Sequence, residues 1–372
     1  MQKIYLDNAA TTPLTSQVKQ YIIESLDQYA NPSSLYQSGV DTRQIIEQAR
    51  KNVANFINGK SENVIFTSGG SASNTLAVRG YVQRNNCTVL YSPIAHKSII
   101  KCVESIKNAY SLKVNKYGQI DFDDLKEWLD SRSGKFFVVL DYANSEIGTV
   151  QDVKKIIELC HFYNAIVYLD CTGSISQIPV DVKKLDVDML GFSGHKIHAL
   201  KGIGVLYKKE NIELEPLVYG SQEQGLFGGT ESVINIASLG KAIELYDYSS
   251  ISSNNRDYVY DYIINNIPDS YLVGAPFEHR LPHNLYMCFK GVQGESLMIL
   301  LDMNGIQVST GSACNNYNLE PSNALVAIGM DKEDINSCVR LSFGEELYEN
   351  ELLYVCNTLK KNIEQLRKLN KR

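Results

Sequence analysis

A lysine occupies a position in this sequence where its amine could bond covalently to a bound carbonyl compound. The segment DVDMLGFSGHKIHALKGIGVLY places Lys196 just past a predicted buried strand, in a turn of small residues that a second strand follows. An amine in such a turn can form a Schiff base. A solvated loop lysine is the alternative, since most lysines lie at the surface. Ser193 and His195 stand beside Lys196 and could add hydrogen-bond donors.

Two more polar residues follow predicted strands. Asp170 ends the apolar run AIVYLDC, and a carboxylate there can pair with the protonated pyridine nitrogen of a cofactor, although a helix cap or a metal ligand would fit as well. His96, in SPIAHKSI, begins a helix at a strand end. Its imidazole could stack on an aromatic cofactor and move protons, or it could be a core or capping histidine.

A strand-to-helix turn rich in glycine and serine could hold a phosphate. In FTSGGSASNTLAVRG the turn contains Gly70 and Ser71, and the free N–H groups of the following helix would point at an anion. The turn lacks the G-x-G-x-x-G spacing, which disfavours a dinucleotide site. An ordinary strand-to-helix connection is the alternative.

One cysteine and one arginine complete the set of candidate residues. Cys314 lies in VSTGSACNNYNLEPSNAL, among Gly, Ser, Thr and Asn, where we expect an exposed loop. An accessible thiol is prone to oxidation, so this context favours a nucleophile that reaches a substrate. Arg340 lies in the strand-like CVRLSFG and could bind a carboxylate with two hydrogen bonds, or simply face outward.

The elements that position these residues alternate between strands and helices. From about residue 63, short β-branched runs such as VIFTS, CTVLYS, KFFVVLDY and AIVYLDC are separated by helical patterns. This alternation predicts an α/β fold with a mostly parallel sheet covered by helices. Ligands bind such sheets beyond the carboxyl ends of the strands. The later runs NLYMCFK, IQVST and CVRLSFG, with a closing amphipathic helix, predict a smaller α+β unit.

The length predicts two domains. A chain of 372 residues exceeds the usual size of a single core, and we expect a large domain over 16–248 and a small domain formed by 1–15 and 249–372.

The net charge of −6 favours neither a nucleic acid nor an anionic membrane as a partner. No apolar stretch approaches the roughly 20 residues of a membrane span, and we expect no signal peptide.

The other cysteines predict a reduced protein without a structural metal. The eight cysteines show no C-x-x-C pair and no metal-ligand spacing, so we expect no metal and a cytoplasmic location. Seven of them lie in helix-like or strand-like contexts and are predicted to be small core residues.

Taken in order, these segments resemble the cysteine desulfurases, which belong to the class V aminotransferase group of fold type I pyridoxal phosphate (PLP) enzymes. The resemblance runs collinearly over almost the whole chain, and the chain looks like a divergent member. The matching segments are YLDNAATTP, NPSSLYQSG, FTSGGSASN, AHKSI, ANSEIGTVQD, LDCTGS, FSGHKIHALKGIG, GGT, STGSAC, LEPS and VRLSFG.

The resemblance implies a mechanism and a substrate. Lys196 holds PLP, and L-cysteine replaces the lysine while its carboxylate pairs with Arg340. Lys196 moves protons, and His96 helps. Cys314 attacks the sulfur of the substrate as a thiolate, which leaves a persulfide on Cys314 and releases alanine. The sulfur then passes to a protein acceptor.

The resemblance also implies contacts to the cofactor. Asp170 supports the ring nitrogen and His96 stacks on the ring, while Asn144 lies close to the cofactor and the substrate. The phosphate is bound by Gly70, Ser71, Ser193 and His195. Family members are homodimers that share their active sites, so Thr230 is expected to reach the phosphate of the other subunit.

Several positions depart from the family pattern. A glutamine that donates to the phenolate oxygen of PLP is replaced by Gly173, and the second of two paired asparagines is replaced by Ser145. The loss of a donor to the phenolate predicts an altered cofactor environment. Three further departures are Phe227 for an arginine, Ala95 for a glutamate, and Tyr36 where a histidine is common.

Two other functions fit the same residues. One is a PLP-dependent lyase or aminotransferase acting on another amino acid, which Gly173, Ser145 and Phe227 favour and the Cys314 loop disfavours. The other is a non-catalytic partner in a sulfur-transfer complex, which predicts a protein without PLP. The chain ends at LRKLNKR without a long tail. We therefore expect a sulfur acceptor such as a tRNA thiolation enzyme rather than an iron–sulfur scaffold protein.

Overall fold

A computed structural model describes residues 3–131, 134–310, 321–344 and 346–370. Its larger sheet, in the described chain, has seven strands in the spatial order β2-β8-β7-β6-β5-β3-β4. The neighbours from β7 to β4 are parallel, whereas β8 is antiparallel to both β7 and β2. The strands are β2 (Val64–Thr67), β3 (Thr88–Tyr91), β4 (Ala109–Ser111), β5 (Phe136–Asp141), β6 (Ile166–Asp170), β7 (Met189–Ser193) and β8 (Gly204–Lys208). The predicted mostly parallel sheet is confirmed.

Helices cover both faces of this sheet because its central strands are apolar on both sides. Along β5, Val138 and Leu140 pack with one group of helices, whereas Phe137 and Val139 pack with the other. The first group is α1 (Ser16–Ser25), α2 (Gln37–Phe56), α5 (Phe122–Asp130), α6 (Val153–Phe162), α7 (Val182–Leu185) and α8 (Val233–Glu244). The second group is α3 (Gly70–Arg84) and α4 (Lys97–Val103). Such two-sided burial is typical of parallel sheets.

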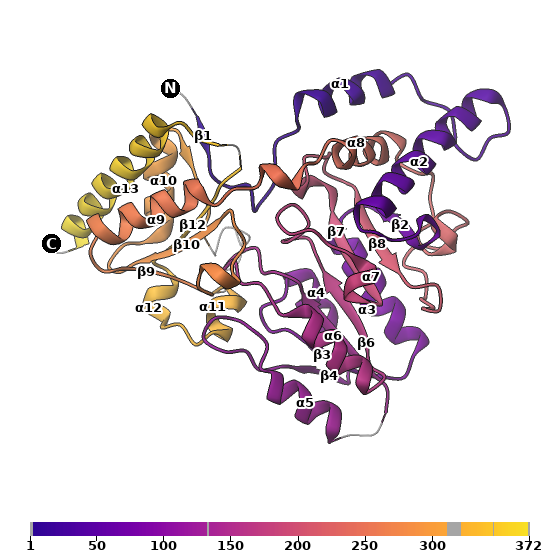
Figure 1. The fold of residues 1–372 in the computed structure, drawn as a ribbon, viewed down its shortest axis with the longest axis horizontal. Coiled ribbons are helices and arrows are strands. Elements are labelled where there is room, and N and C mark those ends of the chain that lie inside the picture. The colour runs from indigo at the N-terminus through magenta and orange to yellow at the C-terminus, as the bar shows by residue number, and fades with distance from the viewer. Residues whose placement is uncertain (1–2, 132–133, 311–320, 345, 371–372) are drawn as a thin grey trace.

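A second, smaller sheet lies beside the first and has its own apolar core (Figure 1). Its described strands are antiparallel in the order β12-β10-β9, and β1 pairs in parallel with β11. These strands are β1 (Ile4–Tyr5), β9 (Ser270–Leu272), β10 (Asn284–Phe289), β11 (Ile306–Gln307) and β12 (Cys338–Ser342). The α+β pattern predicted for the later part of the chain is confirmed. The exact boundaries at residues 15/16 and 248/249 stay a prediction.

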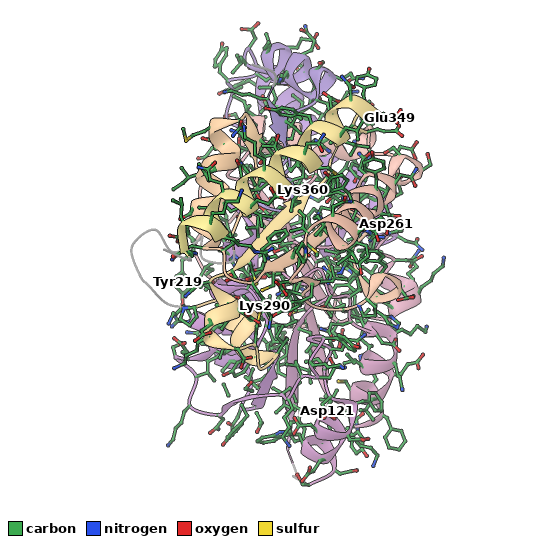
Figure 2. The ribbon with its side chains drawn as sticks, turned by 90° about the vertical axis from the view of Figure 1, so that its left-hand side faces the viewer. Asp121, Tyr219, Asp261, Lys290, Glu349 and Lys360 are labelled. Carbon is green, nitrogen blue, oxygen red and sulfur yellow. The ribbon has the colours of Figure 1, made fainter. Side chains whose placement is uncertain are left out.

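Long helices cover the small sheet (Figure 2). In that view α13 runs along the surface through the labelled Glu349 and Lys360, beside α9 with Asp261. The helices of this part are α9 (Asn254–Asn266), α10 (Gly294–Met303), α11 (Asn323–Ala327), α12 (Lys332–Ile335) and α13 (Glu349–Asn370). Short 3-10 helices are η1 (Ser61–Asn63), η2 (Gly194–Lys196), η3 (Glu223–Gly225), η4 (Tyr248–Ser250) and η5 (Phe277–His279). No helix in the described ranges combines the length and apolar character of a membrane span.

Candidate active site

The candidate residues gather at the carboxyl ends of the parallel strands. Asp170 is the last residue of β6, and Ser193 is the last residue of β7. Lys196 follows in η2, and His96 stands before α4, close enough to both Asp170 and Lys196 for their charges to affect its pKa. Parallel strands end at one edge of a sheet, which explains how residues distant in the sequence come together.

The amine of Lys196 is held by the N-terminal segment of the chain. Its Nζ donates to the carbonyl oxygen of Ala9 and, at 2.9 Å, to that of Ala10. The same segment is fixed to the lysine's own turn, because the amide of Thr12 donates to the carbonyl oxygen of His195 at 2.9 Å. The lysine is therefore directed toward residues 9 and 10 rather than into solvent.

Asp170 is buried and receives two N–H donors. The amide of Thr172 donates to Oδ1 at 2.8 Å, and Nδ2 of Asn74 donates to Oδ2 at 2.8 Å. A carboxylate offers about four lone-pair sites, so these two bonds leave capacity for a further donor such as a protonated ring nitrogen. Asn74 is itself fixed, since the Tyr168 hydroxyl donates to its Oδ1.

A hydrogen-bonded chain links Asp170 to His96. Nδ2 of Asn74 also donates to Oγ of Ser98 at 2.9 Å, and this hydroxyl lies 2.8 Å from Nδ1 of His96. The amide of Ser98 donates to the same ring nitrogen at 3.2 Å, so His96 caps α4. Because the amide of Ser98 can only donate, Nδ1 is the acceptor and the neutral ring carries its proton on Nε2.

The surroundings of His96 favour its neutral form. Its side chain reaches solvent, yet the protein around it is dense enough that desolvation lowers its pKa, and the charge of Lys196 acts in the same direction. The carboxylate of Asp170 opposes this shift. Capping was one of the two alternatives for this histidine, and the geometry combines it with a place at the site. Helix α4 begins at Lys97, directly after His96, as the sequence predicted.

Three elements converge at the start of α3. A Cβ added to Gly70 would lie 3.1 Å from Oγ1 of Thr172 and 3.3 Å from Cβ of Ser193. Oγ1 of Thr172 is buried and has no hydrogen-bond partner among the described residues. The free amides of α3, the orphaned Thr172 hydroxyl and the side chain of Ser193 form a donor set that fits a phosphate group.

The other two residues predicted to contact the phosphate, Ser71 and His195, differ in their exposure to solvent. Ser71 is exposed in the first turn of α3. His195 is half-buried, and its Nδ1 lies 3.1 Å from Oγ1 of Thr11. Burial, together with the charges of Lys196 and Lys201, lowers the pKa of His195 to about 4. The ring is therefore neutral and suited to share a hydrogen bond with an anion.

Arg340 reaches from β12 toward the N-terminal segment. Its Nη2 forms an ion pair with Oδ1 of Asp7 at 2.8 Å, and its Nη1 donates to the carbonyl oxygen of Ser145 at 3.1 Å. Its Nε is buried without a hydrogen-bond partner in the part of the chain that the structure describes. The arginine is thus not an outward-facing strand residue, and it keeps an N–H free for an anionic ligand.

Asn144 shapes the turn after β5. Its Nδ2 donates to the carbonyl oxygen of Ile94 at 2.7 Å, and its Oδ1 accepts the amides of Glu146 and Ile147, each at 2.9 Å. These bonds hold the β5 turn against the segment before His96. Its predicted contact with a cofactor and a substrate stays a prediction.

The departure at Gly173 has a steric cause. A Cβ at this position would lie 2.5 Å from the carbonyl oxygen of Ala143 and 3.2 Å from the amide of Ser145. No side chain fits there without a backbone shift, so the missing glutamine and the neighbouring Ser145 belong to one local arrangement. Ala95 and Phe227 pack in the apolar layer beneath α3 and α4, and Tyr36 stands exposed before α2.

We expect the substitution Gly173→Gln, which restores the family residue, to destabilise the protein by about 2 kcal/mol, because overpacking typically costs about 1–3 kcal/mol. Thermal unfolding of the purified protein measures the loss. Gly173→Ala is the control, since it adds only the Cβ and should account for most of the effect. An unchanged unfolding temperature in both variants would contradict the steric explanation.

The predicted roles of Thr230 and Cys314 stay predictions. Thr230 is exposed and precedes Glu231, which lines a hollow of about 510 Å³. The other residues that line this hollow are Glu47, Arg50, Ser61, Glu62, Ser221, Gln222, Glu223 and Gln224. Cys314 lies outside the described residues, so its placement stays a prediction.

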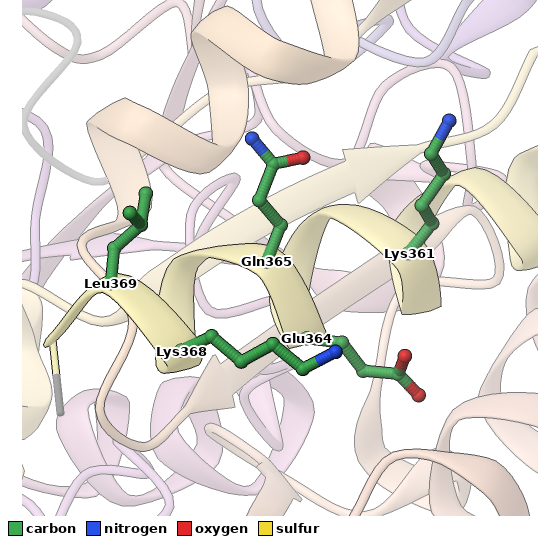
Figure 3. Close-up of a pocket in the computed structure, with 5 residues that line it drawn as sticks. All are labelled: Lys361, Glu364, Gln365, Lys368 and Leu369. Carbon is green, nitrogen blue, oxygen red and sulfur yellow. The ribbon is translucent and has the colours of Figure 1, made fainter.

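A second hollow, of about 360 Å³, lies on one face of α13 (Figure 3). The side chains that line it all come from that helix: Lys361, Glu364, Gln365, Lys368 and Leu369. None of the candidate residues takes part in this hollow, and its solvent-facing lysines and glutamate are typical of an ordinary helix surface.

Sequence reasoning missed several residues at the site. Asp7 pairs with Arg340, Asn74 and Ser98 connect Asp170 to His96, and Thr172 carries an orphaned hydroxyl. YLDNAATTP and FTSGGSASN did mark the segments that contain Asp7 and Asn74. Their partners could not be inferred, because each contact joins distant parts of the chain.

A further residue at the same edge is Asp141, the last residue of β5. Only 4% of its surface is exposed, and neither of its carboxylate oxygens has a hydrogen-bond partner in the described ranges. Burial is the main cause that raises the pKa of Asp141 to about 6. Its own backbone amide opposes this rise, the charge of Asp170 adds to it, and the side chains of Ser92 and Asn144 oppose it more weakly. A buried carboxylate without donors destabilises the fold once it is ionised.

This raised pKa predicts that Asp141→Asn stabilises the protein above about pH 6. The folded pKa of about 6 exceeds the ordinary value of 3.8, so the favourable contribution of Asp141 is complete below pH 3.8 and is lost as the pH rises through 6. The rise of this pKa from 3.8 to about 6 corresponds to a loss of about 3 kcal/mol in the free energy of unfolding, at about 1.36 kcal/mol per pH unit. Guanidinium unfolding of both proteins across this range measures it.

Asp188→Asn is the matched control for this experiment. Asp188 is also 4% exposed, but it accepts the amide of Val167 at 2.8 Å and pairs with His161 and Lys209. Removing its charge should therefore destabilise the protein at neutral pH. If Asp141→Asn and the wild type had the same free energy of unfolding at every pH, the raised pKa of Asp141 would be refuted.

The described cysteines are core residues. Cys87, Cys102, Cys160, Cys171, Cys288, Cys338 and Cys356 are all buried as free thiols. The prediction that these seven are small core residues is confirmed.

Comparison with known proteins identifies relatives over the whole chain. The family model described as aminotransferase class-V matches residues 4–355. A protein named cysteine desulfurase IscS, from Dictyoglomus turgidum, is 36% identical over 98% of this chain and 96% of its own length.

Solved structures show the same fold. A NifS-like protein superposes with a TM-score of 0.90 at 27% identity, and the match covers 98% of this chain and all of that protein. A structure titled "SspA in complex with cysteine" has a TM-score of 0.81 at 30% identity, and the match covers 91% of this chain and 98% of that protein. The PLP-transferase fold type I expected from the sequence is confirmed.

Proposed function

Because this chain belongs to the aminotransferase class-V family, and within it to the cysteine desulfurases, we propose that it converts L-cysteine to L-alanine and takes the sulfur onto Cys314. The observation that supports this function is that Asp170 and Lys196 both lie close to His96, while Lys196 and Arg340 contact neighbouring residues of the same N-terminal segment, Ala10 and Asp7. SspA, one of its structural neighbours, binds cysteine.

The residues at this edge fit pyridoxal phosphate. Lys196 would hold it covalently, Asp170 would accept the N–H of its ring, and His96 would stack on the ring. The start of α3, with Gly70, would hold the phosphate group, and the orphaned Thr172 hydroxyl supports this assignment. Ser71, Ser193 and His195 would add donors. When bound, the cofactor supplies an electron sink for charge that develops on the substrate.

Arg340 would bind the carboxylate of the substrate. Its guanidinium now pairs with Asp7, so a substrate carboxylate would use the remaining N–H groups or replace the aspartate. A planar guanidinium can bind a carboxylate through two parallel hydrogen bonds, which orients the substrate as well as holding it. Asn144 would position the neighbouring turn.

Proton transfer falls to Lys196 and His96. A neutral amine at Nζ of Lys196 can accept a proton from the substrate and return it. The neutral ring of His96 can donate from Nε2 or accept there after losing that proton, while Ser98 holds its Nδ1. The lowered pKa of His96 keeps the ring in this form near neutral pH.

Sulfur transfer falls to Cys314. Its thiolate would attack the sulfur of the substrate, the carbon–sulfur bond would break, and its electron pair would stay with the carbon, which takes up a proton. The products are alanine and a persulfide on Cys314. A protein acceptor would then receive the sulfur, and we propose a homodimer in which Thr230 completes the site of a second copy.

The test of this function is the stoichiometry of the products. Purified full-length protein loaded with pyridoxal phosphate is incubated with L-cysteine and a thiol reductant, and alanine and sulfide are quantified. Equal amounts of both support the proposal. A PLP-bound protein that forms no alanine from cysteine but reacts with another amino acid is instead a lyase or an aminotransferase. A protein that binds no PLP is a non-catalytic partner.

A further inference from the structure

The ends of β5 and β6 place two buried carboxylates side by side. Asp141 and Asp170 are register partners in adjacent parallel strands, so their side chains point to the same face of the sheet. That face is covered by α3, which carries Asn74, and by α4, which His96 caps. Neighbouring strands lie about 4.8 Å apart, which brings the two negative charges within direct electrostatic range.

The two carboxylates differ in their partners. Asp170 accepts hydrogen bonds from the Thr172 amide and from Asn74. Asp141 has no ion pair and no hydrogen bond of normal geometry among the described residues, although it is as deeply buried. Its own amide and the nearby side chains of Ser92 and Asn144 favour its charged form, but burial outweighs them. An uncharged side chain of the same size at this position would avoid the free-energy cost of removing a carboxylate from water. Its register partner Asp170 is the charged group that acts on it, and this interaction raises its pKa.

We propose that Asp141 is a positioning residue of the cofactor site, whose negative charge acts through Asp170 to keep the ring nitrogen of pyridoxal phosphate protonated. The inference rests on the proposed function, because Asp170 must hold that nitrogen. Two carboxylates at one end of the ring stabilise a cation there more strongly than one does. A protonated ring is the better electron sink.

Other ionisable groups interact with this pair. Tyr168 lies on β6 and Cys171 directly follows it, and the charge of Asp170 affects both. His96 stands before α4 and is affected by Asp170 and by Lys196, which follows β7. Above about pH 6 Asp141 is ionised, since its pKa is raised to about 6. Its charge is therefore largely present at neutral pH and complete at alkaline pH, and removing it should lower the pKa of any nearby cationic group.

The experiment is an absorption titration of the bound cofactor. Wild type, Asp141→Asn and Asp188→Asn are purified with pyridoxal phosphate, and their visible spectra are recorded from about pH 5.5 to about pH 9.5, a range that avoids acid unfolding. In Asp141→Asn we expect the pH midpoint of the cofactor's spectral titration to fall by roughly one to two units. This is the effect expected of removing one unit charge from a partly screened interior. The midpoint of Asp188→Asn should stay at the wild-type value, because that residue lies at the opposite edge of the sheet.

Two further variants make the result decisive. Asp141→Glu keeps the charge and should titrate like the wild type, whereas Asp141→Ala removes it and should shift as Asp141→Asn does. Asp141→Ala also gives the answer if the asparagine variant fails to fold. A neutral variant that binds the cofactor and titrates at the wild-type midpoint overturns the inference while the proposed function stands. A wild type without a cofactor band overturns the proposed function first, and the inference with it.

Discussion

Replacing Lys196 by alanine is expected to reduce alanine formation from L-cysteine by at least about a thousandfold. Proton transfer by one positioned side chain contributes about 10²- to 10⁴-fold on its own, and Lys196 is also proposed to hold the cofactor. Its Nζ lies against the carbonyl oxygens of Ala9 and Ala10. Alanine is quantified by amino-acid analysis, and borohydride reduction followed by mass spectrometry shows whether the cofactor is attached.

Lys201→Ala is the control for this experiment. Lys201 lies in the same connection between β7 and β8, but its side chain is exposed. It should keep both the activity and the borohydride-stable cofactor. If Lys196→Ala retained a covalently attached cofactor, another lysine would be the attachment site and the assignment would be wrong.

Replacing Cys314 by alanine is expected to abolish both sulfide release and alanine formation, with at least about a thousandfold loss of rate, because the sulfur of the substrate then lacks a nucleophile. Cofactor binding and its spectrum should remain, since the cofactor contacts proposed here come from other residues. Sulfide and alanine are measured in parallel with the visible spectrum. A variant that forms alanine at the wild-type rate would favour a different enzyme class.

The other thiols of the described chain are poorly suited to replace Cys314. A nucleophilic cysteine must ionise readily and reach its substrate. Burial raises the pKa of Cys87 and of Cys102 to about 11, and that of Cys160 and of Cys356 to about 12. Burial likewise raises the pKa of Cys171.

The remaining pair, Cys288 and Cys338, lies side by side on β10 and β12 within an apolar cluster. The close approach of these two thiols raises the pKa of Cys338 and lowers that of Cys288, and both thiols donate to the carbonyl oxygen of Asp334. Neither thiol is accessible to a substrate, because both are buried. Cys87→Ala is a suitable control for Cys314→Ala, since it removes a buried thiol in the connection between α3 and β3 and should leave the rate unchanged.

The local features of the site were predictable because they depend on neighbouring residues. The apolar run before Asp170 and the small residues around Lys196 predicted a strand end and a turn, and β6 and η2 confirm both. Alternation of β-branched strands with helical patterns predicted the parallel sheet, since a strand buried on both faces must be apolar throughout. The edge at which strand-end residues meet follows from the same topology.

The contacts between distant segments were not predictable from those patterns. Asp7 and Arg340 are separated by 333 positions, and Lys196 lies 187 positions from Ala9, yet both pairs are in contact. Propensity and periodicity describe only a window of several residues, whereas these pairs form when the N-terminal segment crosses to the small sheet through β1 and β11.

The sequence by itself therefore determined the strand ends, the turns and the identities of the reactive groups, because these depend on residue type and local spacing. The tertiary structure alone decided which charges act together. The register of β5 against β6 places Asp141 beside Asp170, and the approach of the Ala143 carbonyl oxygen excludes any side chain at Gly173. Both results depend on distances between separate strands and turns, which only the packed chain determines.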